Sequence, residues 1–200
     1  MVEDFPPDSW PVASSEEEFK NWLITVRTDK VRMPDSSHAE RTVVTHIGAV
    51  AILALDEQDR VLMIRQYRHP VARQLWEIPA GLRDVKDEAL VDTARRELLE
   101  ETGHVAREWH ALVDTYASPG IITERIRIFL ARGLEAAESD YQREGEEKFL
   151  RTAWVPLAEA VRAALAGKLH NGATVQGVLA TQVAAAAGYS GLRPADAPET

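Results

Sequence analysis

Two apolar runs in the first half of the chain predict buried strands. Residues 48–55 (GAVAILAL) are continuously apolar and end at the polar turn DEQD. Residues 61–67 (VLMIRQY) follow that turn and are expected to form the neighbouring strand. A third, shorter strand is expected over residues 75–81 (LWEIPAG), where proline and glycine end the extended segment.

The hydrophobic period changes over residues 88–102. Leu90, Ala94 and Leu98 recur at every fourth position there. This spacing places one apolar stripe on an amphipathic helix. Gly103 directly follows and is well placed to cap the C-terminal end of that helix.

The remaining chain adds strands first and helices last. Strands are expected over residues 111–116 and 125–131, and a further strand is expected to end at Trp154-Val155. Helices are expected over residues 157–166 and 173–187. This order lacks the regular alternation of a doubly wound parallel sheet, and it therefore predicts an α+β fold.

Both ends of the chain differ in composition from its middle. We expect a flexible N-terminal arm over residues 1–19, which are rich in proline, serine and glutamate. Residues 20–46 predict a β-hairpin around the turn PDSSH, and residues 47–190 predict the main domain. Residues 191–200 are rich in proline and alanine, so a frayed C-terminal tail is expected.

Composition narrows the possible functions. The formal net charge of -9 argues against a non-specific nucleic-acid binder, which would carry a basic face. The chain has no cysteine, which excludes disulfides, cysteine-zinc sites and thiol nucleophiles and fits a reducing cytoplasm. The acidic N-terminus lacks the apolar core of a secretory leader, and no run is long enough to span a membrane.

The expected helix carries a cluster of carboxylates. Glu97, Glu100 and Glu101 are three and four positions apart, which places them on one side of a helix. Arg96 is four positions before Glu100 and could neutralise and orient it. A solvated acidic face is the simpler interpretation, but negative charge in the last turn opposes the helix dipole. Oxygen ligands at this density suit Mg²⁺ or Mn²⁺.

This segment resembles the motif of the Nudix hydrolase family, a glycine followed by a glutamate and then by R-E-U-x-E-E-x-G-U, with U an aliphatic residue. Residues 81–103 read GLRDVKDEALVDTARRELLEETG and match it from Glu88 onward without a gap. There are two departures. Six residues instead of five separate Gly81 from Glu88, and His104 stands where an aliphatic residue is usual.

The resemblance implies an α/β/α sandwich with a mixed sheet, here with an added N-terminal hairpin, and a divalent metal cofactor, Mg²⁺ or Mn²⁺. The metal ligands that it implies are the carbonyl of Ala80 and the side chains of Glu97, Glu100 and Glu101. The resemblance further implies that Glu97 and Glu101 are the main ligands and are thereby catalytic. It implies structural roles for Gly81, Glu88, Arg96 and Gly103.

Flanking segments resemble the ADP-ribose pyrophosphatase branch of the family. They include RQYRH (residues 65–69), LWEIPAGL (residues 75–82) and SPG (residues 118–120), which is followed by Glu124. In this branch a proline about 16 residues after the motif is associated with ADP-ribose, and Pro119 lies at that distance. Thr123 replaces an acidic residue that is often found in the branch.

Three further residues are candidates for binding substrate. Arg68 is expected to contact phosphate or ribose, because a guanidinium group matches phosphate oxygens; the alternative is an exposed arginine at a strand end. Arg41 is a candidate on the adenosine side or in the pocket wall. Trp76 is a candidate for the pocket wall, but it lies in an apolar strand and suits the core equally well.

Hydrolysis also requires a base for the attacking water. The acidic loop after residue 135 offers Glu144, Glu146 and Glu147. The resemblance favours Glu147 as the catalytic base, with Glu146 second. The alternative is that this loop is only solvated.

The expected activity is metal-dependent hydrolysis of ADP-ribose to AMP and ribose 5-phosphate. One alternative is a Nudix pyrophosphatase for another nucleoside diphosphate sugar or dinucleotide. The other is a non-catalytic nucleotide-sensing domain, although such domains usually lose glutamates that this motif retains. The expected partners are a small nucleotide substrate and a second copy of the chain, because the hairpin of residues 20–46 contributes to a shared dimer site in the resembling branch. Neither a nucleic acid nor a membrane is expected as a partner.

Overall fold

The computed structural model describes residue 4, residues 10–142 and residues 145–199, without the side chains of Glu146 and Glu147. The chain divides into two compact units. One contains Met1–Ile47 and Ser118–Glu124, and the other contains Gly48–Ala117 and Arg125–Thr200. Within the described ranges, no helix is both long and apolar enough to cross a membrane.

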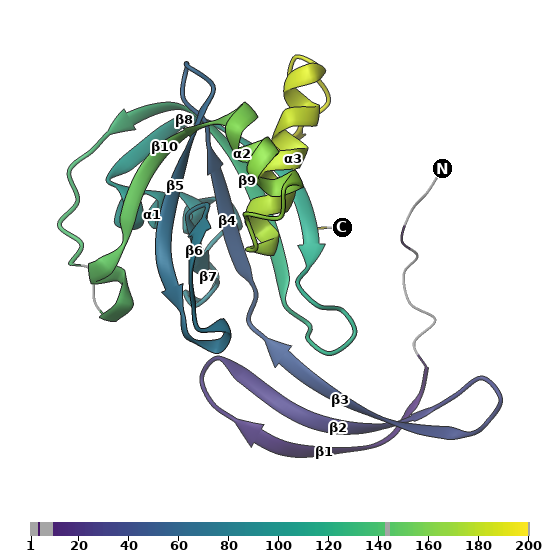
Figure 1. Ribbon diagram of the computed structural model, residues 1–200. Coiled ribbons are helices and arrows are strands. Elements are labelled where there is room, and N and C mark those ends of the chain that lie inside the picture. Colours follow the sequence, from purple (N-terminus) through teal and green to yellow (C-terminus); the bar gives the residue numbers. More distant parts are fainter. Residues whose placement is uncertain (1–3, 5–9, 143–144, 200) are drawn as a thin grey trace. The chain divides into compact units, whose positions relative to one another are not determined.

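The first unit contains a three-stranded antiparallel sheet (Figure 1). Its strands are β1 (Val12–Lys20), β2 (Ile24–Arg32) and β3 (His38–His46). The expected hairpin is formed by β2 and β3, which pair from Ile24 opposite His46 to Arg32 opposite His38.

Strand β1 corrects the prediction of a flexible N-terminal arm for residues 12–19, while residues 1–3 and 5–9 of that arm lie outside the described residues. Every residue of β1 is exposed, so its sequence shows no alternation of apolar and polar positions that would mark a strand. The strand is ordered instead by its backbone pairing with β2 and by a hydrogen bond of 2.6 Å from the Ser15 hydroxyl to Asp29.

The second unit is built around a mixed five-stranded sheet in the order β11-β8-β9-β4-β7. Strand β4 pairs with β9 in parallel, and every other pair in this sheet is antiparallel. The strands are β4 (Ala49–Ala54), β7 (Ala80–Leu82), β8 (His104–Tyr116), β9 (Arg125–Ala136) and β11 (Arg193–Pro194).

Helices cover both faces of β4, which explains why its sequence is apolar at every position. Ala51 and Leu53 face the core beneath α2 (Leu157–Leu165) and α3 (Gly172–Ala186). Val50 and Ile52 face the core beneath α1 (Leu90–Thr102). Figure 1 shows α1 on one side of β4, and α2 and α3 on the other. The predicted α/β/α sandwich with a mixed sheet is therefore confirmed.

A second, antiparallel sheet in the order β10-β5-β6 belongs to the same unit. Strand β5 lies in the middle and supplies the buried side chains of Leu62, Met63 and Ile64. The elements are β5 (Arg60–Arg68), β6 (Arg73–Glu77) and β10 (Arg151–Pro156), with two short 3-10 helices, η1 (His69–Val71) and η2 (Gly145–Phe149).

The C-terminal tail corrects a second prediction, because it is anchored and not frayed. Arg193 in β11 pairs with Ala111 in β8. Arg127 donates hydrogen bonds to the carbonyls of Ala197 at 2.5 Å and Pro198 at 3.0 Å. The tail is therefore ordered by a buried arginine of β9, a long-range contact that the composition of the tail does not reveal.

Candidate active site

Helix α1 is fixed to the sheet by one face and presents carboxylates beside it. Ala94 and Leu98 are fully buried in the core, as their fourfold spacing predicts. Gly103 ends the helix in the left-handed conformation at φ 68°, and its N–H donates to the carbonyl of Leu99. The helix begins at Leu90, two residues later than predicted, because Ala89 has extended backbone.

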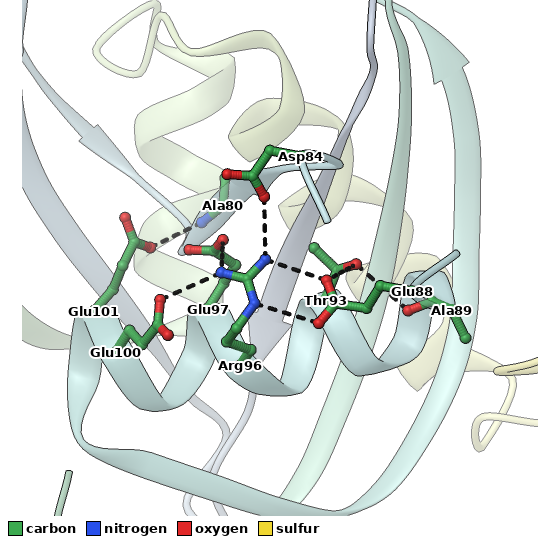
Figure 2. Close-up of polar contacts among 9 residues, drawn as sticks. All are labelled: Ala80, Asp84, Glu88, Ala89, Thr93, Arg96, Glu97, Glu100 and Glu101. Atoms are coloured by element: carbon green, nitrogen blue, oxygen red, sulfur yellow. Dashed lines mark hydrogen bonds and ion pairs between the residues drawn. The ribbon is translucent and has the colours of Figure 1, made fainter. Parts of the chain in front are cut away.

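Arg96 is surrounded by carboxylates, as Figure 2 shows. Its guanidinium lies 2.7 Å from Glu97, 3.2 Å from Glu88, 3.3 Å from Glu100 and 3.5 Å from Asp84. We call these five residues the Arg96 network. Burial opposes the charge of Arg96, but the hydrogen bond to Glu88 and the nearby carboxylates outweigh it and raise the pKa of Arg96.

Glu88 lies just before the helix and ties its first turn to Arg96. It accepts hydrogen bonds from the Thr93 hydroxyl at 2.8 Å and from Arg96. The bond from Arg96 is the main reason that the pKa of Glu88 lies below its ordinary value. The expected contact of Arg96 with Glu100 is therefore present, and a contact with Glu88 that was not predicted accompanies it. Both contacts fit structural roles for Arg96 and Glu88.

Glu97 is the most perturbed carboxyl group of the network. Only 13% of its side chain is exposed. Burial raises its pKa to about 7; Arg96 opposes this effect and Glu100 adds to it. The carboxyl lies directly against the backbone of Gly81, where an added Cβ would overlap it. Glycine at this position therefore creates the space that Glu97 occupies.

Glu101 is held at the same loop from the other side. It is 5% exposed and accepts a hydrogen bond of 2.9 Å from the amide of Ala80. Ala80 starts β7, which pairs with β4 opposite Ala51. The Ala80-Gly81 backbone thus lies beside both Glu97 and Glu101, although the two side chains are four positions apart on the helix.

These residues suit a hard divalent cation. Among the described residues, no three acidic or histidine side chains surround one common point, because Arg96 attracts Glu97 and Glu100 while the Ala80 amide holds Glu101. The donors are carboxylate oxygens, which Mg²⁺ and Mn²⁺ prefer. The buried carboxyl of Glu97 keeps a raised pKa although Arg96 lies beside it, because Arg96 is shared with three other carboxylates, and the absence of a side chain at Gly81 lets Glu97 lie against the backbone. The donor set therefore fits such an ion.

Glu77, which positions Arg68, was not predicted from the sequence. Glu77 is 1% exposed and accepts two hydrogen bonds from Arg68, at 2.6 Å and 2.9 Å. The amide of Gln66 lies 3.4 Å from the same carboxylate. A charged residue inside the apolar segment LWEIP was the available sign, because a buried carboxylate requires a partner.

The other predicted substrate residues lie on different elements. Arg41, on β3, and Pro119 are exposed and belong to the first unit, whereas the carboxylates of α1 belong to the second. Trp76, on β6, packs against the core beneath α2 and α3. The substrate roles of all three residues stay predictions.

The predicted base lies on η2 (Gly145–Phe149). This short helix includes the backbone of Glu146 and Glu147, while their side chains lie outside the described part of the chain. Glu144 lies outside the described residues altogether. The choice of Glu147 before Glu146 therefore stays a prediction.

A mixed sheet between helices, with the carboxylates of α1 beside the Ala80-Gly81 backbone, is typical of hydrolases that use a divalent metal. The model of the NUDIX domain matches residues 45–175, and the chain belongs to this family as a Nudix hydrolase. An ADP-ribose pyrophosphatase of Mycobacterium tuberculosis is 42% identical over 92% of this chain and 87% of the relative. An ADP-ribose pyrophosphatase of Bacillus subtilis is 32% identical over 82% of this chain and 88% of the relative.

A solved structure supports the fold. The crystal structure of an ADP compounds hydrolase superposes with a TM-score of 0.78 at 18% identity, covering 94% of this chain and 99% of that one. At this identity the likeness concerns the fold alone. The two ADP-ribose pyrophosphatases confirm the predicted resemblance to that branch of the family.

Proposed function

We propose that this chain hydrolyses ADP-ribose to AMP and ribose 5-phosphate. The observation that carries the proposal is the presence of Glu97, Glu100 and Glu101 on α1, with Glu88 just before it, in a chain 42% identical to an ADP-ribose pyrophosphatase over nearly its whole length. Water adds to one phosphorus of the diphosphate, and the bridging P–O bond breaks. The bridging oxygen stays with one product and the oxygen of water enters the other.

We propose Mg²⁺ or Mn²⁺ as the cofactor, held by Glu97, Glu101, Glu100 and the carbonyl of Ala80. Such an ion lowers the pKa of water and stabilises charge on a diphosphate. Arg96 keeps Glu97 and Glu100 close together through its hydrogen bonds at 2.7 Å and 3.3 Å. The Ala80 amide holds the Glu101 carboxylate in place at 2.9 Å.

Other side chains would orient the substrate and move the proton. The Arg68 guanidinium donates two hydrogen bonds to the buried Glu77 carboxylate, which would hold it in one orientation for contact with a phosphate oxygen. Glu147, with Glu146 as the second choice, would accept the proton of the attacking water. Arg41, Trp76 and Pro119 remain the candidates for contacts with the rest of the substrate.

A panel of diphosphate substrates tests this function. Equal concentrations of ADP-ribose, ADP-glucose, GDP-mannose and a dinucleoside diphosphate are incubated with the protein and Mg²⁺ or Mn²⁺, and products are separated by chromatography. We expect the highest kcat/KM for ADP-ribose, with AMP and ribose 5-phosphate in equal amounts. Faster cleavage of another substrate would assign the chain to a different specificity. No cleavage at all would favour the nucleotide-sensing alternative.

We also propose that the enzyme acts as a cytoplasmic homodimer. The support is the first unit, in which the exposed edge strand β1 offers a surface for pairing, and the absence of cysteine, which fits a reducing compartment. Light scattering after gel filtration tests the assembly. A mass near 44 kDa, about twice the 22.2 kDa chain, is expected, and a monomer at working concentration would contradict it.

A further inference from the structure

A cavity of about 630 Å³ lies at the end of β5, in the sheet β10-β5-β6. Its walls come from four elements: Arg65 and Tyr67 of β5, Gln74 of β6, Lys148 and Phe149 of η2, and Arg151 of β10. The carboxylates of α1 and the Ala80-Gly81 loop do not line it. The cavity therefore does not include the proposed metal ligands, although η2, which lines it, also carries the proposed base Glu147.

The cavity concentrates positive charge in a chain whose formal net charge is -9. Arg65, Lys148 and Arg151 all line it, and the described lining residues include no acidic side chain. None of the three cations takes part in an ion pair within the part of the chain that the structure describes. Most arginines of this unit, in contrast, lie beside a carboxylate.

Two of the cations lie directly opposite each other on neighbouring strands. Arg151 of β10 pairs with Arg65 of β5 in the antiparallel register, so the two side chains stand on the same face of the sheet. Like charges placed directly opposite each other in this way destabilise a sheet. An anion bound between them would remove that repulsion.

The Arg65 side chain is also incompletely hydrogen-bonded. Its Nε is buried and has no hydrogen-bond partner, which is uncommon for a guanidinium nitrogen shielded from water. The guanidinium lies over the ring of Trp76, with 5.5 Å between Cζ and the ring centroid. Trp76 thus holds the arginine in place without neutralising it.

We propose that this cavity binds a phosphate monoester that carries an organic group, such as a nucleoside monophosphate or a sugar phosphate. The dianionic phosphate would lie among Arg65, Lys148 and Arg151. The cavity is much larger than a phosphate ion, and two aromatic side chains border it: Phe149 is 80% exposed and Tyr67 is 39% exposed. They provide flat apolar surface for a base or sugar. The proposal goes beyond hydrolysis and does not depend on which substrate the enzyme cleaves.

Thermal unfolding in the presence of ligands tests the site. The full-length protein is titrated at constant ionic strength, without divalent metal, with AMP, ribose 5-phosphate, inorganic phosphate or adenosine. The variants are Arg151→Gln alone and Arg65→Gln combined with Arg151→Gln. Arg107→Gln is the matched control, because it removes the same charge from an exposed residue of β8 that pairs with Glu135. Arg151 is exposed, so its single variant tests the site even if the double variant does not fold.

We expect a saturable rise in Tm with phosphate-bearing ligands for the wild type and for Arg107→Gln. The apparent Kd should be at least about tenfold weaker in Arg151→Gln and weaker still in the double variant. Tighter binding of AMP than of ribose 5-phosphate would identify a nucleotide as the ligand, and the reverse order a sugar phosphate.

Three results would overturn the proposal. The first is an unchanged Kd in both variants, which would place the phosphate at another site. The second is the absence of any saturable shift in the wild type. The third is a Tm that depends on protein concentration but not on phosphate, which would mean that carboxylates of a second copy neutralise these cations.

Discussion

Two arginines of the same unit show how differently charge can be arranged. Arg96 on α1 faces four carboxylates, and its side chain is 29% exposed. Arg127 on β9 is 2% exposed and pairs with one carboxylate, Asp114, through bonds of 2.7 Å and 2.8 Å. Arg193 and two carbonyls of the tail complete this second group, which we call the Arg127 cluster.

The pKa shifts of the carboxyl groups differ in direction. Burial raises the pKa of Glu97 in the Arg96 network to about 7, despite the adjacent arginine. Burial also acts on Asp114, but the hydrogen bonds from Arg127 and Arg193 outweigh it and hold the pKa of Asp114 below its ordinary value. In the Arg127 cluster, both oxygens of the single carboxylate are paired with arginines, whereas in the Arg96 network four carboxylates share one arginine. The excess negative charge around Arg96 suits a cationic ligand, and the fully paired Asp114 suits stability.

The largest effect is expected for Glu97→Gln. It removes a proposed metal ligand, and kcat should fall by more than about 100-fold, since loss of residues that merely support metal ligands already costs 10- to 100-fold. The Tm should stay the same or rise, because one of several repelling carboxylates is lost. Steady-state kinetics and calorimetry measure both quantities.

Asp92→Asn is the matched control for that variant. Asp92 lies on the same helix, and its exposed side chain pairs only with Arg95 among the described ion pairs. Its kcat should remain close to that of the wild type. Equal losses in the two variants, or a Glu97→Gln protein with near-normal kcat, would remove Glu97 from the mechanism.

The next largest effect, a loss of stability, is expected for Asp114→Asn. Arg127 would remain buried without its carboxylate, and breaking such a pair costs about 3 kcal/mol of unfolding free energy. Urea denaturation measures the loss, and kcat at low temperature should change little. Glu135→Gln, which breaks the exposed pair with Arg107, should cost far less. Similar losses in the two variants would show that the Arg127 cluster is not a special source of stability.

The lowered pKa of Asp114 predicts that the unfolding free energy depends on pH. Because the pKa of Asp114 is lower in the folded state, its contribution is complete above the ordinary value of 3.8 and is lost as pH falls through the folded pKa. Unfolding free energies of wild type and Asp114→Asn should therefore converge as pH decreases below 3.8. A difference that stays constant down to the lowest accessible pH would contradict the assignment.

A smaller effect, on kcat, is expected for Gly81→Ala. The new Cβ would overlap the Glu97 carboxyl, which must then move away from the Ala80-Gly81 backbone. Small displacements of this kind reduce catalysis, and we expect kcat to fall about tenfold. Gly172→Ala is the control, because a Cβ there meets nothing within 4 Å. Equal kcat values for the two variants would mean that the position of Glu97 is not restricted by Gly81.

The elements that could be predicted are those in which buried residues follow a regular pattern along the sequence. Strand β4 was identified by an apolar run because both its faces are buried, and α1 by the spacing of Leu90, Ala94 and Leu98. The contact between Arg96 and Glu100 was predictable because both lie on one helix at fixed spacing.

Features that depend on contacts distant in sequence were not predicted. Strand β1 is exposed throughout and is ordered by β2, while the tail is ordered by Arg127, about 70 residues earlier. The pairing of Arg68 with Glu77 requires β5 and β6 to be adjacent. Likewise, the opposition of Arg65 and Arg151 appears only once β10 is paired with β5.

Binding of Mn²⁺, followed by electron paramagnetic resonance, tests most directly whether the excess charge around Arg96 is a metal site. Wild type, Glu97→Gln and Asp114→Asn are titrated at neutral pH without substrate. We predict that wild type and Asp114→Asn bind Mn²⁺ with the same Kd and that Glu97→Gln binds it at least about tenfold more weakly. Equal Kd values for all three proteins would contradict the account.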